Sequence, residues 1–139
     1  MNPNIWGEPA WIFLHTITLS YPTCPSEQDK ENYKQFFIAL QHVLPCTTCK
    51  AHFNGHLKKY PLSNEVLSSK EKVIKWLIDV HNAVNITTNK PTMSYNEVLL
   101  KYNNMYSTNK LSNKMMIQIY VILIIFIFLI MILSVLFFR

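Results

Sequence analysis

The stretch that decides the fold is SSKEKVIKWLIDVHNAVN, residues 68–85. Its apolar side chains recur at the spacing of one face of an α-helix, and Ser68 followed by Glu71 is a capping pair typical of a helix start. We therefore expect an amphipathic helix that buries one face against other helices. That face contains Val73, Trp76, Leu77, Val80 and Val84, with His81 alongside.

Segments on either side of this stretch also predict helices, at about 9–20, 26–44 and 46–60, and almost no strands. Pro9 suits a first helical turn, and Ser26 with Asp29 resembles a capping box. Ser94 and Glu97 introduce a shorter fifth helix. We expect an all-α fold, a four-helix bundle with a short fifth helix. The inward faces contain Trp11, Leu14, His15 and Thr18; Tyr33, Phe36, Phe37, Leu40 and Leu44; Cys49, His52, Phe53, His56, Leu57 and Tyr60; and Tyr95, Val98, Leu99 and Tyr102.

The C-terminal part has a different composition. Of the 24 residues 115–138, 22 are apolar, whereas the first 114 residues are about 41 % hydrophobic. At about 1.5 Å per residue such a helix reaches about 36 Å, enough to cross a hydrocarbon layer of about 30 Å. The expected organisation is a helical domain at 1–108, a short polar linker at 109–114 and a transmembrane helix at 115–138 that acts as a tail anchor.

Charge and glycine content exclude several classes of protein. Residues 1–114 contain twelve lysines and eight acidic residues in a scattered arrangement, which is typical of a solvated surface and not of a nucleic-acid site. Two glycines in the chain disfavour a Rossmann or P-loop domain. The N-terminus lacks the features of a signal peptide. Lys101, Lys110 and Lys114 precede the apolar segment and Arg139 follows it, so we expect the domain on the cytoplasmic side.

Two of the three cysteines form the motif Cys46-Thr-Thr-Cys49 at a predicted helix start, where unpaired N–H groups and the helix dipole favour a thiolate. A redox-active dithiol is one interpretation. Metal binding with His52 and His56 is a second, although ten residues of one helix span about 15 Å, too far for all four side chains to reach one ion. Inert buried thiols are a third. Cys24, in a proline-flanked loop, is expected to have no catalytic role.

An all-helical domain with this motif lacks the strand context of thioredoxin, so a bound electron acceptor is an attractive hypothesis. Several aromatic and imidazole side chains could hold a flat ring, or could simply pack the core. These are Trp6, Trp11, Trp76, Tyr95, Tyr102, His15, His52 and His81.

Five short motifs in register over residues 5–103 resemble the Erv/ALR family of FAD-linked sulfhydryl oxidases. The membrane-anchored form is similar to the members found in large cytoplasmic DNA viruses. The motifs are Trp6-Gly7-x-x-x-Trp11-x-x-Leu14-His15-Thr16, Tyr21-Pro22, Pro45-Cys46-x-x-Cys49-x-x-His52-Phe53, His81-Asn82-x-Val84-Asn85 and Lys90-Pro91.

The resemblance implies an enzyme that passes electrons from a substrate dithiol to Cys46 and Cys49, then to FAD and dioxygen, releasing hydrogen peroxide. It implies that Cys49 lies beside the flavin ring and that Cys46 exchanges with substrate thiols. It also implies a homodimer. The cofactor-binding residues that it implies are Trp11, His15, His52, His81, Asn82, Val84, Asn85, Lys90 and Tyr95.

The chain departs from the family pattern in two places. Glu8-Pro9 stands where the family has an arginine, and no cysteine follows Cys49, so the family's later structural disulfide and any C-terminal shuttle pair are missing. We therefore expect electrons to come directly from a partner, a thioredoxin-like viral protein, at a host-cell or virion membrane. The competing interpretation is a tail-anchored helical adaptor whose cysteines are structural or bind metal.

Overall fold

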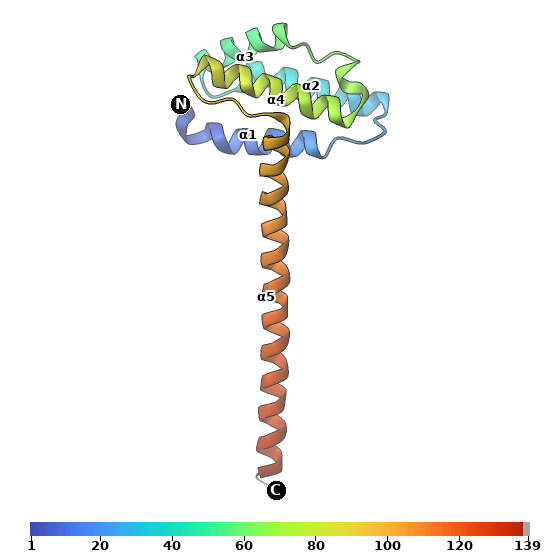
Figure 1. The fold of residues 1–139 in the computed structure, drawn as a ribbon, viewed down its shortest axis with the longest axis vertical. Helices are drawn as coiled ribbons and strands as arrows, with labels where there is room; N and C mark the ends of the chain where they lie inside the picture. The colour runs from blue at the N-terminus through green and yellow to red at the C-terminus, as the bar shows by residue number, and fades with distance from the viewer. Residues whose placement is uncertain (138–139) are drawn as a thin grey trace. The chain divides into compact units, whose positions relative to one another are not determined.

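The computed structural model describes the backbone of residues 1–137 and the side chains of residues 1–107 and 113–136. The chain divides into two compact units, Met1–Tyr95 and Asn96–Arg139, and each is described by itself (Figure 1). The first unit contains α1 (Pro3–Leu19), α2 (Glu27–Val43), α3 (Thr47–Lys59), the short 3-10 helix η1 (Val66–Ser68) and α4 (Lys70–Thr87). Together with the helix of the second unit, they confirm the all-α fold for the part of the chain that is described.

Helix α4 is central to the first unit. It packs against α1, α3 and η1, and α2 packs against α3 and η1. The expected face of α4 is buried except for Val84, which is half-buried, and the fully buried Phe37 of α2 meets Trp76 edge to face at 5.0 Å between ring centroids. Each large apolar side chain removed from water in this way contributes about 1.5–3 kcal/mol to folding.

Helix α1 begins earlier than the sequence indicates. The Asn2 side chain accepts a hydrogen bond from the Asn4 backbone N–H at 3.0 Å and caps the helix, and Pro3 occupies the first helical turn. Pro9, which we expected near the helix start, lies inside the helix, where it lacks the N–H that would bond to the Ile5 carbonyl.

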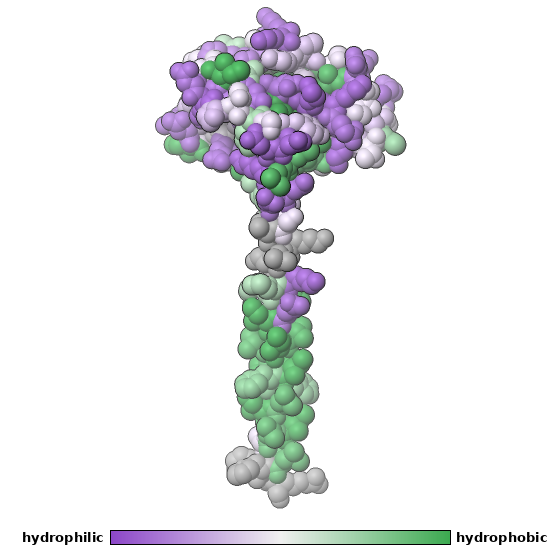
Figure 2. All heavy atoms as spheres, in the orientation of Figure 1, coloured by the Kyte–Doolittle hydropathy of each residue, from purple (hydrophilic) through white to green (hydrophobic). Residues whose placement is uncertain are grey.

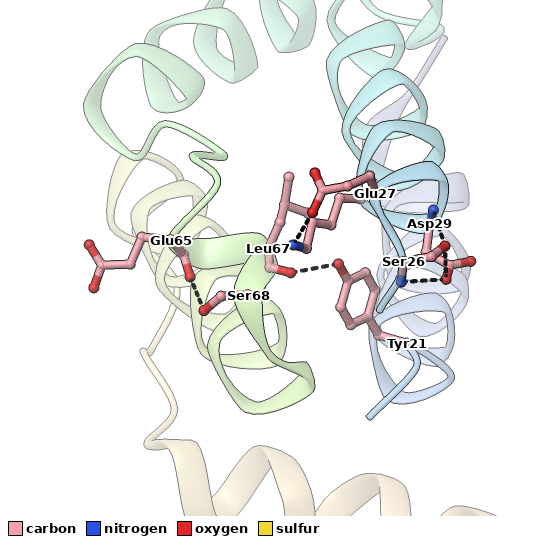
Figure 3. Close-up of polar contacts among 8 residues, drawn as sticks. Tyr21, Ser26, Glu27, Asp29, Glu65, Leu67 and Ser68 are labelled. Atoms are coloured by element: carbon pink, nitrogen blue, oxygen red, sulfur yellow. Dashed lines mark hydrogen bonds and ion pairs between the residues drawn. The ribbon is translucent and has the colours of Figure 1, made fainter. Parts of the chain in front are cut away.

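Side-chain caps fix the other helix starts. The capping box of α2 is confirmed, because Ser26 and Asp29 bond to each other (Figure 3), and the hydrogen bond from the Ser26 hydroxyl lowers the pKa of Asp29. Helix α4 is capped by Ser69 and not by Ser68 as expected. Ser68 ends η1, where its hydroxyl donates to the Glu65 carbonyl at 2.7 Å (Figure 3).

The buried face of α3 is narrower than the expected stripe. Phe53 is buried, whereas Cys49, His56, Leu57 and Tyr60 are partly exposed and His52 is exposed. The expectation that His52 faces inward is therefore wrong. A one-residue step turns the helix by about 100°, so a face centred on Phe53 turns its neighbour His52 toward solvent.

The second unit is dominated by α5 (Tyr95–Phe137), a continuous helix of 43 residues. The short fifth helix and the polar linker at 109–114 are thus one helix with the apolar segment, because no proline or glycine follows Pro91 to interrupt it. The side chains at 108–112, Phe138 and Arg139 lie outside the described residues, and the domain boundary at 108 stays a prediction.

Residues Asn113–Leu136 of α5 are long and apolar enough to cross a membrane, and their side chains are exposed. Figure 2 shows hydrophobic residues along this stretch of the helix. A helix that is apolar on every side and not buried by protein needs another apolar surrounding, so α5 suggests a membrane anchor.

Substituting Tyr21 tests the packing of the first unit. The Tyr21 side chain is 1 % exposed, and its hydroxyl donates to the Leu67 carbonyl at 2.8 Å (Figure 3). Tyr21→Phe leaves that carbonyl without its partner and should lower the free energy of unfolding by about 1–3 kcal/mol, measured by denaturant unfolding of the full chain in detergent.

The matched control is Tyr33→Phe, because the Tyr33 ring packs edge to face on Tyr21 but is only half-buried. The control should change stability by less than about 0.5 kcal/mol. Equal losses in the two variants would contradict a specific role for the Tyr21 hydroxyl.

Candidate functional site

The two cysteines of the Cys46-x-x-Cys49 motif form a disulfide at the start of α3, with their Cα atoms 5.1 Å apart. Cys46 is the N-cap residue, and its Sγ accepts a hydrogen bond from the Cys49 backbone N–H at 3.2 Å. Sulfur therefore occupies the place that a serine or aspartate oxygen usually takes at a helix start. The same N–H and the positive end of the helix dipole can stabilise negative charge on Cys46 Sγ when the bond opens.

The disulfide is partly exposed to solvent. Cys46 and Cys49 are both half-buried, and the neighbouring Pro45, Thr47 and Thr48 are exposed. The α-ammonium group of Met1 donates to the Pro45 carbonyl at 3.0 Å, so the start of α1 lies beside the motif. The motif is thus partly open to solvent, with the start of the chain beside it.

An aromatic pair joins α1 to α4. The rings of Trp11 and His81 stack at 3.9 Å between centroids with an interplanar angle of 8°. His15, which is 1 % exposed, places its Nε2 atom 3.0 Å from Nδ1 of His81. The structure therefore brings together three of the residues expected to hold a flat ring.

The segment after α4 is fastened by Asn82. Its amide Nδ2 donates to the Met93 carbonyl at 2.8 Å, and its Oδ1 accepts from the Met93 N–H at 3.0 Å. Buried Asn85 receives the Lys90 backbone N–H on its carbonyl at 2.8 Å. Asn89 has a φ of 54°, a left-handed conformation that asparagine tolerates. These contacts fix the backbone that carries Lys90, whose side chain is exposed.

The structure places other candidate residues on three helices, α3, α4 and α5. Val84 is half-buried, and His52 on α3 makes no hydrogen bond or ring contact with the Trp11, His15 and His81 group among the described residues. Tyr95 stands at the start of α5. Trp76 packs in the core and donates from Nε1 to the Tyr60 carbonyl at 2.9 Å. For Trp76, the core-packing interpretation is the one confirmed.

Two buried ring nitrogens, Trp6 Nε1 and His56 Nε2, have no hydrogen-bond partner among the described residues. Burial lowers the pKa of His56, and the positive charges of His52 and Lys59 lower it further. The described residues bring no group of three or more His, Cys, Asp or Glu side chains together for a metal ion. The sequence analysis identified Trp6 as a candidate aromatic side chain, but it could not predict that the ring nitrogen would be buried without a partner among the described residues. The role of Met93 has no sequence signal, because it bonds through its backbone.

Comparison with known proteins identifies relatives of this chain. The model of the Erv1/Alr family matches residues 8–106. A "Probable FAD-linked sulfhydryl oxidase" of Acanthamoeba polyphaga mimivirus is 46 % identical over 99 residues, which are 71 % of this chain and 69 % of the viral protein. The mitochondrial FAD-linked sulfhydryl oxidase of Saccharomyces cerevisiae is 31 % identical over 65 % of this chain. The match spans 46 % of the yeast protein, less than half of its length.

A solved structure shows the same fold. The crystal structure of the FAD-binding domain of yeast Erv1 superposes with a TM-score of 0.64 at 30 % sequence identity. The superposition covers 69 % of this chain and 89 % of the yeast chain.

Asn82→Ala should loosen the segment after α4, because it removes both side-chain bonds to Met93. Hydrogen exchange at the Met93 amide should accelerate by at least about tenfold, which corresponds to about 1.4 kcal/mol of local stability. The control is Thr87→Ala, which removes a hydroxyl bond to the Ala83 carbonyl within α4. An unchanged exchange rate at the Met93 amide in Asn82→Ala would contradict the role of the Asn82 side chain in holding this segment.

The lowered pKa of His56 gives the fold a pH dependence. The unfolded chain binds a proton at this histidine more readily than the folded chain, so this contribution to stability is complete above about pH 6.5 and declines as pH falls. His56→Phe should flatten the fall in unfolding free energy between about pH 7 and pH 5. The His42→Gln control should retain it, because His42 is an exposed histidine of α2 that does not contribute to the lowered pKa of His56. An unchanged slope in His56→Phe would show that other groups cause the acid sensitivity.

Proposed function

The chain belongs to the Erv1/Alr family of FAD-linked sulfhydryl oxidases, and from this premise we propose that its Cys46–Cys49 disulfide takes the electrons of substrate dithiols. The observation that carries the proposal is the accessible disulfide at the start of α3 in a fold that matches an FAD-binding domain. Its substrates are thiols, and its oxidant is dioxygen.

The residues present fit FAD in chemical type. Trp11 and His81 offer flat ring faces, and the buried nitrogens of Trp6 and His56 lack partners among the described residues and could bond to polar atoms of a cofactor. The exposed Lys90 supplies a positive charge suited to a diphosphate. We propose that Trp11, His15, His81, Val84 and Asn85 hold the heterocycles. His52, Asn82 and Tyr95 are further candidates. The Asn82 amide already binds the Met93 backbone, and His52 is exposed.

Thiol exchange begins when a substrate thiolate attacks Cys46 Sγ. The Cys46–Cys49 bond breaks, Cys49 leaves as a thiolate, and a mixed disulfide joins Cys46 to the substrate. The second substrate thiol then attacks the substrate sulfur of that mixed disulfide. Cys46 leaves as a thiolate that the Cys49 N–H can stabilise. The substrate is now oxidised, and the enzyme holds two reduced cysteines.

FAD, when bound, would supply the redox chemistry that takes two electrons from the Cys46 and Cys49 thiols as they re-form the disulfide and that reduces dioxygen to hydrogen peroxide. We propose that Cys49 faces the cofactor, because Cys46 at the helix tip is the one that meets substrate. The net reaction converts a dithiol and dioxygen to a disulfide and hydrogen peroxide, so electrons and protons balance.

The electron donor and the location are also proposals. No cysteine follows Cys49 in the sequence, which supports direct reduction by a partner protein of thioredoxin type. The mimivirus relative supports a viral setting. We propose a homodimer anchored by α5 with its catalytic domain on the cytoplasmic side of a host or virion membrane.

Cys49→Ser should abolish dithiol-dependent oxygen uptake while flavin absorbance stays with the purified protein, because the disulfide is lost and the cofactor site is kept. Oxygen-electrode assays of the full chain in detergent measure the rate. Cys24→Ser is the matched control, since Cys24 is an exposed free cysteine outside the motif, and it should retain full turnover. Turnover by Cys49→Ser at the wild-type rate would overturn the proposal.

A further inference from the structure

The disulfide lies in the middle of a segment without acidic residues. Residues 32–64 contain four lysines and three histidines but no aspartate or glutamate, and all eight acidic residues of the chain lie outside this segment. The surroundings of the redox centre are therefore more basic than the scattered charge of the whole chain indicates.

Local helix stability does not explain this charge. Helices α2 and α4 carry Glu27, Asp29 and Glu71 in their first turns, where acids complement the helix dipole. Helix α3 has no acid in its first turn and has Lys50 one turn after Cys46, a position where positive charge opposes the dipole. Lys58 and Lys59 at the C-terminal end of α3 do complement the helix dipole. Lys50 is therefore the lysine whose position helix stability does not explain.

The α3 lysines are also not neutralised within the described residues. The ion pairs found there join Lys30 to Glu27, Lys72 to Glu65 and Lys75 to Asp79. None of them involves Lys50, Lys58 or Lys59. The positive charge of α3 is thus available to a partner.

Exposed side chains lie close to the disulfide along the chain. Val43 at the end of α2 is 69 % exposed, and Ala51 is exposed on α3. Thr47 and Thr48 lie between the two cysteines. Exposed apolar and small side chains beside an unpaired lysine are features of surfaces that a protein partner covers. We call these four residues and Lys50 the disulfide surface.

We propose that the disulfide surface binds a dithiol protein whose cysteines are flanked by acidic residues. This inference rests on the proposed function, which requires a substrate thiol to reach Cys46 through this surface. Opposite charges raise the rate of encounter and fall in effect with salt, so the preference acts on kcat/KM and not on kcat.

Two dithiol peptides test the preference. They share one Cys-x-x-Cys core and differ only in flanking glutamates or flanking lysines, and the full chain in detergent oxidises each in an oxygen-electrode assay. At low salt, kcat/KM should be about tenfold higher for the acidic peptide, and the two values should converge as salt is raised. The rate of oxidation of dithiothreitol, a neutral dithiol, measures the activity of the redox centre without any effect of substrate charge.

Charge reversal then locates the effect. K50E should remove most of the preference for the acidic peptide, whereas its turnover of dithiothreitol should stay at the wild-type rate. The control K70E makes the same change in net charge at a similarly half-buried lysine on α4, outside residues 32–64, and it should keep the preference.

The outcomes separate the two claims. Normal turnover of dithiothreitol with equal kcat/KM for both peptides overturns the docking inference and leaves the oxidase standing. Loss of the preference in K70E, or its full persistence in K50E, also overturns the inference, because the charge of the disulfide surface would then not decide the preference. Failure of the wild-type protein to oxidise dithiothreitol overturns the proposed function and the inference with it.

Discussion

The packing of α4 is the constraint on which the rest of the first unit depends. One face of this helix must bury Val73, Trp76, Leu77 and Val80 in the core, and the next residue, His81, must stack on Trp11 of α1. Because the helix repeat fixes the angle between these positions, burying the core face also sets the imidazole. One orientation of α4 therefore satisfies both the core packing and the stacking of His81 on Trp11.

The redox centre depends on a different part of the same framework. Helix α3 packs on α2 and α4, which leaves its first turn accessible and keeps Cys46 at the N-cap position. The sulfur there has two roles, since it caps the helix through the Cys49 N–H and is the atom that a substrate thiolate attacks. Bound FAD would further stabilise the folded state by mass action, which matters for a domain with a modest core.

Most of the fold could be predicted from periodic apolar positions and caps, as the stripe of α4 and the Ser26–Asp29 box show. The early start of α1 could not, because Pro9 gives a stronger signal than Asn2 and Pro3. The outward turn of His52 could not, because the 3,1,3 spacing does not fix how wide the buried face is. The continuity of α5 could not be predicted, because the polar residues at 109–114 suggest a linker. Polarity alone does not end a helix.

The candidate site was predictable only in part. Spacing located the Cys46-x-x-Cys49 motif at a helix start, and motif resemblance located Trp11, His15 and His81, which the structure brings together. The clamp of Asn82 on the Met93 backbone could not be predicted, because a side-chain-to-backbone bond across eleven residues leaves no pattern in residue types. The unpaired nitrogens of Trp6 and His56 likewise depend on tertiary packing.

An anaerobic titration of the purified full chain with a dithiol, followed by visible absorbance and by thiol counting, tests the oxidase mechanism most directly. We expect a yellow protein that loses its flavin absorbance only when the Cys46–Cys49 disulfide can be reduced, consuming one dithiol equivalent for the disulfide and one for the flavin. Readmitted air should restore the colour and release hydrogen peroxide. A colourless protein, or flavin bleaching that proceeds equally without the cysteine pair, would contradict the mechanism.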